Sequence, residues 1–598
     1  MTYRAPLNDM RFTMRHIADL KALSQLEGLA AADPEVVDQA LEEAGKLAEG
    51  VLAPLNRVGD QQGSRLENGV VRTPDGFADA YAQYRDGGWN AVPFAPEYGG
   101  MGLPWLVGVA CEEMWNSANM GFALCPLLNQ GAVEAIHHWG TPEQKALYLP
   151  KLISGHWTGT MNLTEPQAGS DVGALRSRAE PGPNGSWRIY GQKIFITYGD
   201  HDFAENIVHL VLARTPDSPP GTRGISLFIV PKHLPDGAGE PGKRNDLRCV
   251  SLEHKLGIHA SPTAVMSYGD HEGAVGWMLG PEHAGMRAMF TMMNNARLAV
   301  GVQGLAIAER AYQQAVAYAC ERRQGKALQA TAPGPAAIVE HADVRRMLMT
   351  MKAGVDAMRA LCYVNAEALD LARRHADPEA RARYEGLAAL LTPISKAWCT
   401  DMGVELASIG VQVHGGMGFI EETGAAQHYR DARILPIYEG TNGIQAMDLV
   451  MRKTGAEGGA VVRRLIAEMR AVDGGLADAG PPFAAMRANL AAAVGAVERA
   501  SDWMLAALET RPNAAAAGCA PFLRAWGLTL GGWLLARGAL AARSMALAGA
   551  GDRGFLDGRI AAARFFAEQM LPQAPALAVA AVAGDELLYA IPADGLVA

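Results

Sequence analysis

The stretch RIYGQKIFIT, residues 188–197, is short and rich in β-branched and aromatic residues, which is the composition of a β-strand. Three further stretches share this composition and are separated by clusters of Gly, Pro, Asp and Ser: NIVHLVLA (206–213), GISLFIVP (224–231) and TAVMSYG (263–269). Together they predict an all-β segment of roughly 120 residues, which we place at residues 158–281.

Helical patterns flank the β segment on both sides. Before it, apolar residues recur at spacings of three and four and form one amphipathic face: Val36, Val37, Ala40, Leu41, Ala44, Leu47, Ala48 and Val51. After it, a second apolar face contains three methionines: Val344, Met347, Leu348, Met351, Val355 and Met358. Such a face is typical of a buried core rather than a cofactor site. The break TAPGP (331–335) separates the helix that carries this face from the preceding helix.

The chain of 598 residues is too long for one hydrophobic core, so we expect several domains. The predicted fold is mainly α, with a middle domain that is a β-barrel or sandwich and an extra helical domain at the C-terminus. We expect these parts to be a loosely attached N-terminal arm (1–34), a helical domain (35–157), the β domain (158–281), a second helical domain (282–453) and the C-terminal helical domain (454–598).

Composition indicates an ordinary globular protein that binds small molecules or proteins. Hydrophobic residues make up 49% of the chain, and the net charge of −10 argues against nonspecific attraction to nucleic acid or anionic lipid. The seven cysteines are scattered, which favours a reducing compartment, and no targeting signal is visible, so we expect a cytoplasmic protein. The most apolar stretch, residues 527–536, is too short to span a bilayer, and we expect no membrane span.

Several familiar motifs are absent or incomplete. Residues 237–243 spell G-x-x-x-x-G-K, but Arg244 stands where a phosphate-binding loop needs Ser or Thr. No G-x-G-x-x-G follows a predicted strand, so the sequence does not support a Rossmann nicotinamide site. The fifteen histidines include no His-x-x-x-His pair, and we expect no metal site.

Three motifs suggest chemistry, although each also has a plain structural interpretation. MNLTEPQAGSD (161–171) offers two hydroxyls, Thr164 and Ser170, on a loop that can also be a simple turn. HGGMG, within QVHGGMGF (412–419), lets backbone approach a bulky anion, or merely ends a helix. YEGTNGIQ (438–445) places Glu439 between an aromatic residue and a glycine. Glu439 could remove a proton from a weakly acidic carbon, or could simply occupy the first turn of a helix.

These three motifs, taken in order with FIT (195–197) and ERRQGK (321–326), resemble the acyl-CoA dehydrogenase family of flavoproteins over roughly residues 35–452. The segment after residue 453 and the sequence EHKLGIHASPTAVMSYG (253–269) resemble the larger bacterial branch that includes 3-methylthiopropionyl-CoA dehydrogenases. The very-long-chain enzymes of the family carry a comparable C-terminal extension.

The resemblance implies FAD as cofactor, bound between the β domain and the second helical domain and shared across a dimer interface. The implied FAD-binding residues are Met161, Leu163, Thr164, Ser170, Phe195, Thr197, Arg322, Gln324, Gln412, Gly415, Gly416 and Thr441. Among these, Thr164 would bind the flavin pyrimidine edge, and Arg322 with Gln324 would reach the pyrophosphate in the neighbouring subunit. Phe195 stands where many relatives have Trp, while Gly325 and Gly443 replace residues whose contacts therefore cannot be assumed.

The resemblance also implies the reaction, α,β-dehydrogenation of an acyl-CoA thioester, with Glu439 as the base that removes the α-proton. Some branches place the base on another helix, but MMNNARL (292–298) has no carboxylate at that place. The implied substrate-binding residues are Ser170, Asn294, Arg297, Glu439 and Gly440. Arg297 could instead form an ordinary ion pair between helices.

Electrons would pass from reduced FAD to an electron-transfer flavoprotein, and we expect a homodimer. The acyl chain could be 3-methylthiopropionyl or a short or medium fatty acyl group. Three alternatives remain: an acyl-CoA oxidase that uses oxygen, a DNA-associated flavoprotein of the same superfamily, and a scaffold without activity. Residues 454–598 hold twelve arginines, no lysine and thirteen acidic residues, which is no electrostatic footprint for DNA.

Overall fold

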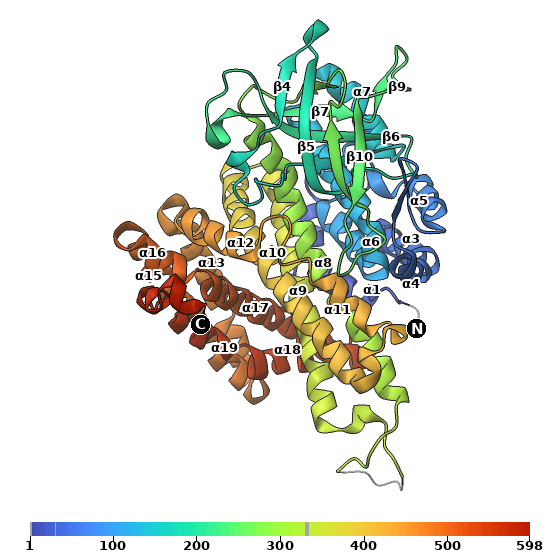
Figure 1. Ribbon diagram of the computed structural model, residues 1–598. Coiled ribbons are helices and arrows are strands. Elements are labelled where there is room, and N and C mark those ends of the chain that lie inside the picture. Colours follow the sequence, from blue (N-terminus) through green and yellow to red (C-terminus); the bar gives the residue numbers. More distant parts are fainter. Residues whose placement is uncertain (1–2, 30–31, 329–333, 598) are drawn as a thin grey trace. The chain divides into compact units, whose positions relative to one another are not determined.

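The computed structural model describes residues 3–29, 32–328 and 334–597. The chain divides into two compact units, one built mainly from residues 39–299 and the other from residues 6–38 and 300–598. Helices predominate, and the strands, drawn in blue to green in Figure 1, fall in the first unit. The prediction of a mainly α fold with a β middle domain is confirmed.

The β domain is a small barrel. Among the described residues, its largest sheet has eight strands: β3 (Trp157–Asn162), β4 (Arg178–Pro181), β5 (Trp187–Thr197), β6 (Asn206–Arg214), β7 (Ile225–Pro231), β10 (Leu247–Leu252), β11 (Thr263–Tyr268) and β12 (Ala274–Met278). The strand order is β10-β11-β5-β12-β7-β6-β3. Strand β4 pairs with both β5 and β6, so β5, β12, β7, β6 and β4 form a closed ring. Two short hairpins accompany it: β1 (Arg65–Glu67) with β2 (Val70–Arg72), and β8 (His233–Pro235) with β9 (Pro241–Arg244).

Strand β6 is mostly apolar, with His209 as the polar residue in its middle. Leu210 and Leu212 join a core that includes residues of the neighbouring helices. Val211 and Ala213, which point to the opposite face, join the core of the barrel. A strand buried on both faces has no solvent-facing position, so β6 is apolar except at its ends and at His209, which is buried and hydrogen-bonded to the Tyr268 hydroxyl at 3.0 Å.

The helices of the first unit precede the barrel. They are α3 (Pro34–Leu47), α4 (Ala53–Gln62), α5 (Phe77–Asp86), α6 (Trp105–Trp139) and α7 (Pro142–Ser154). Helix α6 is buried over most of its length and leaves helical geometry at Asn119, whose side-chain oxygen accepts a hydrogen bond from the N–H of Phe122 at 3.1 Å. Helix α8 (Gly285–Glu321) begins in this unit and ends in the second.

Among its described residues, the second unit contains helices and loops but no strand of the sheets. Its helices are α1 (Leu7–His16), α2 (Leu20–Ser24), α9 (Ala342–Arg374), α10 (Pro378–His414), α11 (Ala425–Ala432), α12 (Asn442–Asp448), α13 (Ala460–Ala471), α14 (Asp473–Asp478), α15 (Ala484–Thr510), α16 (Pro512–Ala517), α17 (Cys519–Leu547), α18 (Arg553–Phe565) and α19 (Gln573–Ala581). Of the predicted break at 331–335, residues 331–333 lie outside the described part. Met351 and Met358 on α9 are fully buried, which confirms that the methionine face is core.

Helix α17 joins the C-terminal helices to α9 and α10. Its sequence is apolar on every side, as expected of a central buried helix. At Gly527, α17 approaches α10 so closely that a Cβ on Gly527 would lie 2.2 Å from Cγ of Trp398 on α10. Residues after 453 are therefore packed into this unit rather than appended to it.

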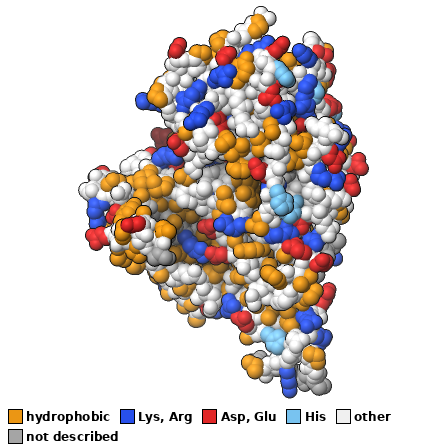
Figure 2. All heavy atoms as spheres, in the orientation of Figure 1, with side chains coloured by type: hydrophobic (Ala, Val, Ile, Leu, Met, Phe, Trp, Pro, Cys, Tyr) orange, Lys and Arg blue, Asp and Glu red, His pale blue; other side chains and the backbone are white. Residues whose placement is uncertain are grey.

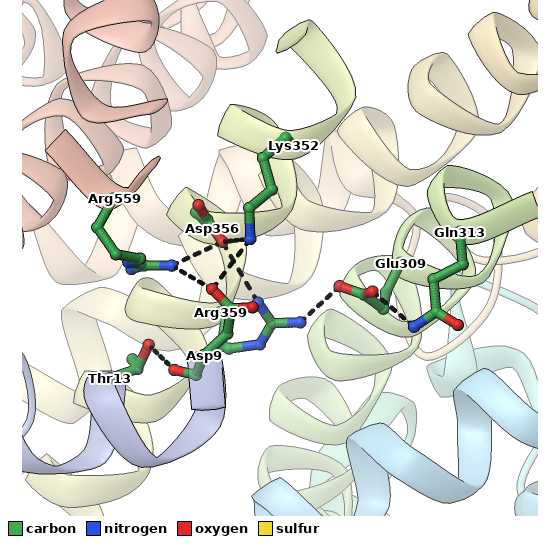
Figure 3. A network of polar contacts seen from close by, with 8 residues as sticks. All are labelled: Asp9, Thr13, Glu309, Gln313, Lys352, Asp356, Arg359 and Arg559. Atoms are coloured by element: carbon green, nitrogen blue, oxygen red, sulfur yellow. Dashed lines mark hydrogen bonds and ion pairs between the residues drawn. The ribbon is translucent and has the colours of Figure 1, made fainter. Parts of the chain in front are cut away.

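The prediction of a loosely attached N-terminal arm is wrong. Met10, Met14 and Ile17 are buried, and α1 packs against α9 and α17. These residues lie four and three positions apart, the spacing of one helical face. Asp9 of α1 also accepts hydrogen bonds from two cations, Lys352 of α9 and Arg559 of α18, at 2.9 Å each. Figure 3 shows the three side chains pointing toward one another.

The structure also bears on three further expectations from the sequence. The G-x-x-x-x-G-K stretch at 237–243 lies in the β8–β9 hairpin, with no helix after it, so it lacks the geometry of a phosphate-binding loop. In the described part of the chain, no helix is both long and apolar enough to cross a bilayer. No group of three or more His, Cys, Asp and Glu side chains in that part could hold a metal ion.

Candidate active site

Glu439 lies in the loop between α11 and α12. Its φ is +55° and that of Gly440 is +85°, so two consecutive residues adopt the left-handed conformation that L side chains rarely take. Helix α12 begins only at Asn442, and Thr441 caps it by accepting a hydrogen bond from the N–H of Ile444 at 3.3 Å. Glu439 is thus not a residue of the first helical turn, and that alternative is wrong. A non-glycine residue held in this conformation is a candidate for function.

Hydrogen bonds anchor the loop on both sides of Glu439. On the C-terminal side, the Asn442 side chain accepts a hydrogen bond from Lys396 Nζ at 2.8 Å and donates one to Asp401 Oδ1 at 2.7 Å, both on α10. On the N-terminal side, the Tyr438 hydroxyl donates to Gln303 Oε1 on α8. Burial raises the pKa of Asp401 and the pKa of Tyr438, so the tyrosine remains a protonated donor.

The glycine-rich motif follows directly from α10. Gln412 is exposed in the last turn, and Gly415, with a φ of +60°, ends the helix. In the described part of the chain, no atom beyond the neighbouring residues lies within 4 Å of the place where a Cβ would stand on Gly415 or Gly416. The motif therefore both ends a helix and leaves open space beside its backbone, so its two interpretations are compatible.

Arg322 and Gln324 lie just after α8 in a segment that pairs with residues 336–338. The N–H of Gln324 donates to the carbonyl of Ala336 at 3.0 Å, and the N–H of Ile338 donates to the carbonyl of Arg322 at 2.8 Å. The Arg322 guanidinium donates to Gln324 Oε1 at 3.3 Å. Both side chains are exposed, so a charged donor and an amide are presented together.

The loop that begins with Thr164, Glu165 and Pro166, named the TEP loop, is held by an ion pair that sequence reasoning missed. Glu165 is buried and accepts hydrogen bonds from Lys193 Nζ at 2.8 Å, Ser177 Oγ at 2.6 Å and the N–H of Arg176 at 2.7 Å. Burial alone would raise the pKa of Glu165, but the Lys193 charge and these donors lower it to about 2. Next to it, the carbonyl of Thr164 accepts from the N–H of Ile194 at 2.9 Å. A lysine in the middle of an apolar strand was the signal for this pair.

Strand β5 is irregular at Phe195. Ile196 pairs with Ala264 and Lys193 pairs with Met266, so Ile194 and Phe195 together face the single residue between those partners. Phe195 has a φ of +60° and a side chain that is 57% exposed. An exposed aromatic residue in a left-handed conformation contributes little to a core, and it suggests a binding role.

The remaining predicted flavin residues of this unit lie on or near the same strands. Met161 is on β3 and is half-buried, as are Leu163 and Thr197. The carbonyl of Leu163 accepts a hydrogen bond from Lys193 Nζ at 3.0 Å, and that of Thr197 accepts one from Thr160 Oγ1 at 2.7 Å. Ser170 is exposed on the loop after β3.

The predicted CoA-binding pair lies one turn apart on α8. The guanidinium of Arg297 donates to Asn294 Oδ1 at 3.3 Å and lies 5.7 Å from the centre of the Phe290 ring. Arg297 is 5% exposed, whereas Asn294 is exposed. The structure therefore brings these two predicted residues into contact.

Within the first unit, the structure groups the predicted residues on β3, the TEP loop, β5 and the start of α8. Within the second, it places Glu439, Gly440 and Thr441 on one loop, and the glycine-rich motif at the end of α10. Sequence reasoning missed the residues that hold these segments: Glu165, Lys193, Gln303, Lys396, Asp401 and Asn442.

Four family models match the chain one after another. They are the acyl-CoA dehydrogenase N-terminal domain at residues 38–156, the middle domain at 160–270 and the C-terminal domain at 283–454, followed by the acetyl-CoA dehydrogenase C-terminal like model at 462–592. The three acyl-CoA dehydrogenase models therefore cover more than half of the chain, and the fourth covers most of the rest.

Relatives agree with these models. A 3-methylmercaptopropionyl-CoA dehydrogenase of Ruegeria pomeroyi is 50% identical over 96% of this chain and 97% of its own length. A butyryl-CoA dehydrogenase of Syntrophomonas wolfei is 35% identical over 95% of each chain. The solved acyl-CoA dehydrogenase of Bacillus anthracis, complexed with FAD, shares the fold with a TM-score of 0.74 and 20% identity over 94% of this chain and 90% of its own. The matches to the first two relatives and to the family models show that the chain belongs to the acyl-CoA dehydrogenase family of FAD-dependent oxidoreductases.

Proposed function

We propose that the enzyme removes hydrogen from Cα and Cβ of a short-chain acyl-CoA thioester, and that Glu439 is the base that takes the α-proton. One observation carries the assignment of the base: Glu439 is held in a left-handed conformation on a loop that is anchored on both sides. The stretch MMNNARL (292–298), where other branches of the family place the base, has no carboxylate.

The residues proposed to hold FAD fit that cofactor in chemistry. The exposed guanidinium of Arg322 suits a pyrophosphate, to which it can donate two hydrogen bonds. Gly415 and Gly416 leave room for a ligand to approach the backbone. Thr164 and Ser170 offer hydroxyls that can donate to or accept from a polar ring. Bound FAD supplies the acceptor for the β-hydrogen, which leaves as hydride.

Residues of the chain itself remove the α-proton of the thioester. The carboxylate of Glu439 accepts the α-proton, and its backbone N–H donates to the thioester carbonyl oxygen. That donor stabilises the negative charge that develops on the oxygen, as in an oxyanion hole. We assign Arg297 and Asn294 to the CoA part, Ser170 to the place where flavin and CoA meet, and Gly440 to substrate binding beside the base.

The substrate proposal rests on the names of the relatives. The Ruegeria pomeroyi relative is named for the 3-methylmercaptopropionyl group, also called 3-methylthiopropionyl, and the Syntrophomonas wolfei relative for butyryl. Both groups are short, and identity to the former is higher. We therefore propose 3-methylthiopropionyl-CoA as the preferred substrate and short straight-chain acyl-CoA as slower substrates.

We also propose an electron-transfer flavoprotein as electron acceptor, a homodimer that completes each FAD site, and a cytoplasmic location. The boundaries of the five parts made from the sequence remain part of this proposal, although the N-terminal segment packs against α9 and α17 and is not loose. Figure 2 shows Lys and Arg side chains interspersed with Asp and Glu on one face of the molecule. A mixed surface of this kind, with thirteen acidic and twelve basic residues after residue 453, disfavours the DNA-associated alternative.

A panel of acyl-CoA thioesters tests the proposal. Short, medium, long, branched and 3-methylthiopropionyl-CoA would each be mixed anaerobically with the holoenzyme, and bleaching of the flavin followed by stopped flow. We expect the fastest bleaching with 3-methylthiopropionyl-CoA and reoxidation by an electron-transfer flavoprotein. Fast reoxidation by air with release of peroxide would favour an oxidase instead, and bleaching by no thioester would contradict the proposed function.

A further inference from the structure

We propose that Asn442, with Asp401 and Lys396 of α10, is a positioning cluster that fixes the direction of the Glu439 carboxylate. The inference rests on the proposed function, because it assigns these residues a role through the base. None of the three is assigned contact with substrate or cofactor. Their contribution is geometric.

The cluster is needed because the loop is strained. Left-handed conformations at non-glycine residues persist only where the surroundings over-determine them. Glu439 and Gly440 both have positive φ, +55° and +85°. A free loop with this sequence would move Glu439 to a more common conformation and turn its carboxylate elsewhere. Something outside the loop must hold it.

Asn442 is the point at which α10 holds the loop from the C-terminal side. Its side-chain oxygen accepts from the fully buried Lys396 at 2.8 Å. Its side-chain nitrogen lies 2.7 Å from Asp401 Oδ1, 3.0 Å from Thr400 Oγ1 and 3.1 Å from the carbonyl of Ala397. One amide thus contacts four groups on about one and a half turns of a single helix.

Hydrogen bonds to the backbone of the loop add to this anchoring. The N–H of Asn442 donates to the carbonyl of Pro436 at 3.0 Å, which closes the loop across Glu439. Gln445 Nε2 donates to the carbonyl of Glu439 at 3.4 Å. Tyr438, bonded to Gln303, fixes the other side. With both flanks held, Glu439 has little freedom to rotate.

The charges in the cluster favour its present arrangement. Lys396 donates to the amide oxygen and Asp401 accepts from the amide nitrogen, so Asn442 has one orientation that satisfies both. A flipped amide would put its nitrogen against the ammonium and its oxygen against the carboxylate. The pair therefore selects one rotamer of Asn442 and, through it, one path for the loop.

The test uses the FAD-loaded enzyme and three variants. Asn442→Ala removes all four contacts, and Asn442→Asp places two carboxylates together. Asn442→Asp combined with Asp401→Asn exchanges the two groups, which restores a hydrogen bond and conserves the charge. Asn365→Ala is the matched control, because Asn365 is a buried asparagine of α9 that donates to Ser395 of α10 at 3.2 Å without touching the loop.

For Asn442→Ala we expect the rate of flavin reduction to fall at least tenfold, while FAD content and acyl-CoA affinity change less than twofold. We expect Asn442→Asp to lose more, and the exchanged pair to regain a rate within about threefold of the starting enzyme. Asn365→Ala should lower the unfolding temperature and leave the rate unchanged. A role in stability alone would instead move the unfolding temperature of Asn442→Ala without this loss of rate.

A cycle with Glu439→Gln separates the two claims. If Asn442 acts through the base, Asn442→Ala should have no further effect on the residual rate of Glu439→Gln. An additive loss, a normal rate for Asn442→Ala, or an exchanged pair as slow as Asn442→Asp would overturn this inference alone. A normal rate for Glu439→Gln would overturn the proposed function as well.

Discussion

A single buried carboxylate, Glu165, decides the shape of the TEP loop. It accepts hydrogen bonds from Lys193, Ser177 and Arg176, and its pKa of about 2 means that it is ionised at neutral pH. Because the folded state lowers this pKa from its ordinary value of 4.5, the pair stabilises the fold fully above pH 4.5 and loses its contribution as pH falls toward 2.

Glu165→Gln should therefore destabilise the protein at pH 7 by about 3–5 kcal/mol, since Lys193 would be left as an unpaired buried charge. The difference from the starting enzyme should shrink as the pH is lowered below 4.5. Thermal unfolding at pH 7 and pH 4 checks both expectations. Replacing both partners together, Glu165→Met with Lys193→Met, is the control and should cost less than the single change. An equal loss at both pH values would contradict the ion-pair account.

The Glu165–Lys193 pair also shows what could not be predicted from the sequence. The motif TEPQAGSD directed attention to Thr164 and Ser170, whose hydroxyls are visible in the sequence as candidate donors. The partner of Glu165 lies 28 residues away on β5, and only strand pairing brings it to the loop. Composition and spacing predict which groups can react, but partners from distant strands appear only in the fold.

Strand β5 combines a stabilising and a strained segment. Its first half pairs regularly with β4 and β12, and its irregularity begins where Phe195 takes a φ of +60°. The strand itself was predictable, because RIYGQKIFIT has a clear β composition. The bulge was not, because nothing in the local composition marks Phe195 as left-handed.

Phe195→Gly tests whether this strain serves binding. Glycine takes a positive φ at little steric cost, and the Phe195 ring is already 57% exposed, so stability should stay within about 1 kcal/mol. Retention of FAD during gel filtration should fall, because the proposed ring contact is lost. Phe228→Gly, at a fully buried position of β7, is the control and should cost at least about 3 kcal/mol. If Phe195→Gly unfolds as readily as the control and keeps its FAD, the residue is core and the proposed contact is absent.

The second unit contains a largely buried network of ion pairs that joins distant parts of the chain (Figure 3). Asp9 of α1 pairs with Lys352 and Arg559. Asp356 pairs with the same two cations and also with Arg359. Arg359 in turn pairs with Glu309 of α8 at 2.7 Å. The three cations and three carboxylates balance. Asp9 and Arg559 are 550 positions apart, so the network ties the two ends of the chain to the central helices.

Asp9→Asn should lower the free energy of unfolding by about 3–5 kcal/mol at pH 7, because the buried Arg559 and the half-buried Lys352 would lose a charged partner. The cations beside Asp9 outweigh its burial and lower its pKa below 3.8, so its contribution is present above that pH and fades as the solution becomes more acidic. Urea unfolding at pH 7 measures the loss. Asp38→Asn is the matched control, since Asp38 pairs with Arg11 and Arg15 at the surface, where a pair contributes about 0–1 kcal/mol. Equal losses for the two variants would contradict the importance of the buried network.

The same network explains why the sequence misled us about the N-terminal arm. The helices of the arm, α1 and α2, are short, and the first 34 residues show no apolar pattern long enough to predict a domain. The barrel and the long helices, in contrast, follow from regular composition and spacing. Docking of α1 depends on Lys352 and Arg559, which are remote in sequence. The site divides in the same way: Glu439 was recognisable from its motif, but the residues that hold its loop were not.

The central claim is that Glu439 removes the α-proton, and anaerobic flavin reduction in Glu439→Gln tests it most directly. The amide keeps the size of the side chain but cannot accept the proton, so the variant should retain FAD and bind acyl-CoA. Its rate of flavin reduction by the best thioester should fall by roughly 100- to 10,000-fold, the range that general base catalysis contributes. Bleaching of the flavin at the rate of the unaltered enzyme would contradict the assignment.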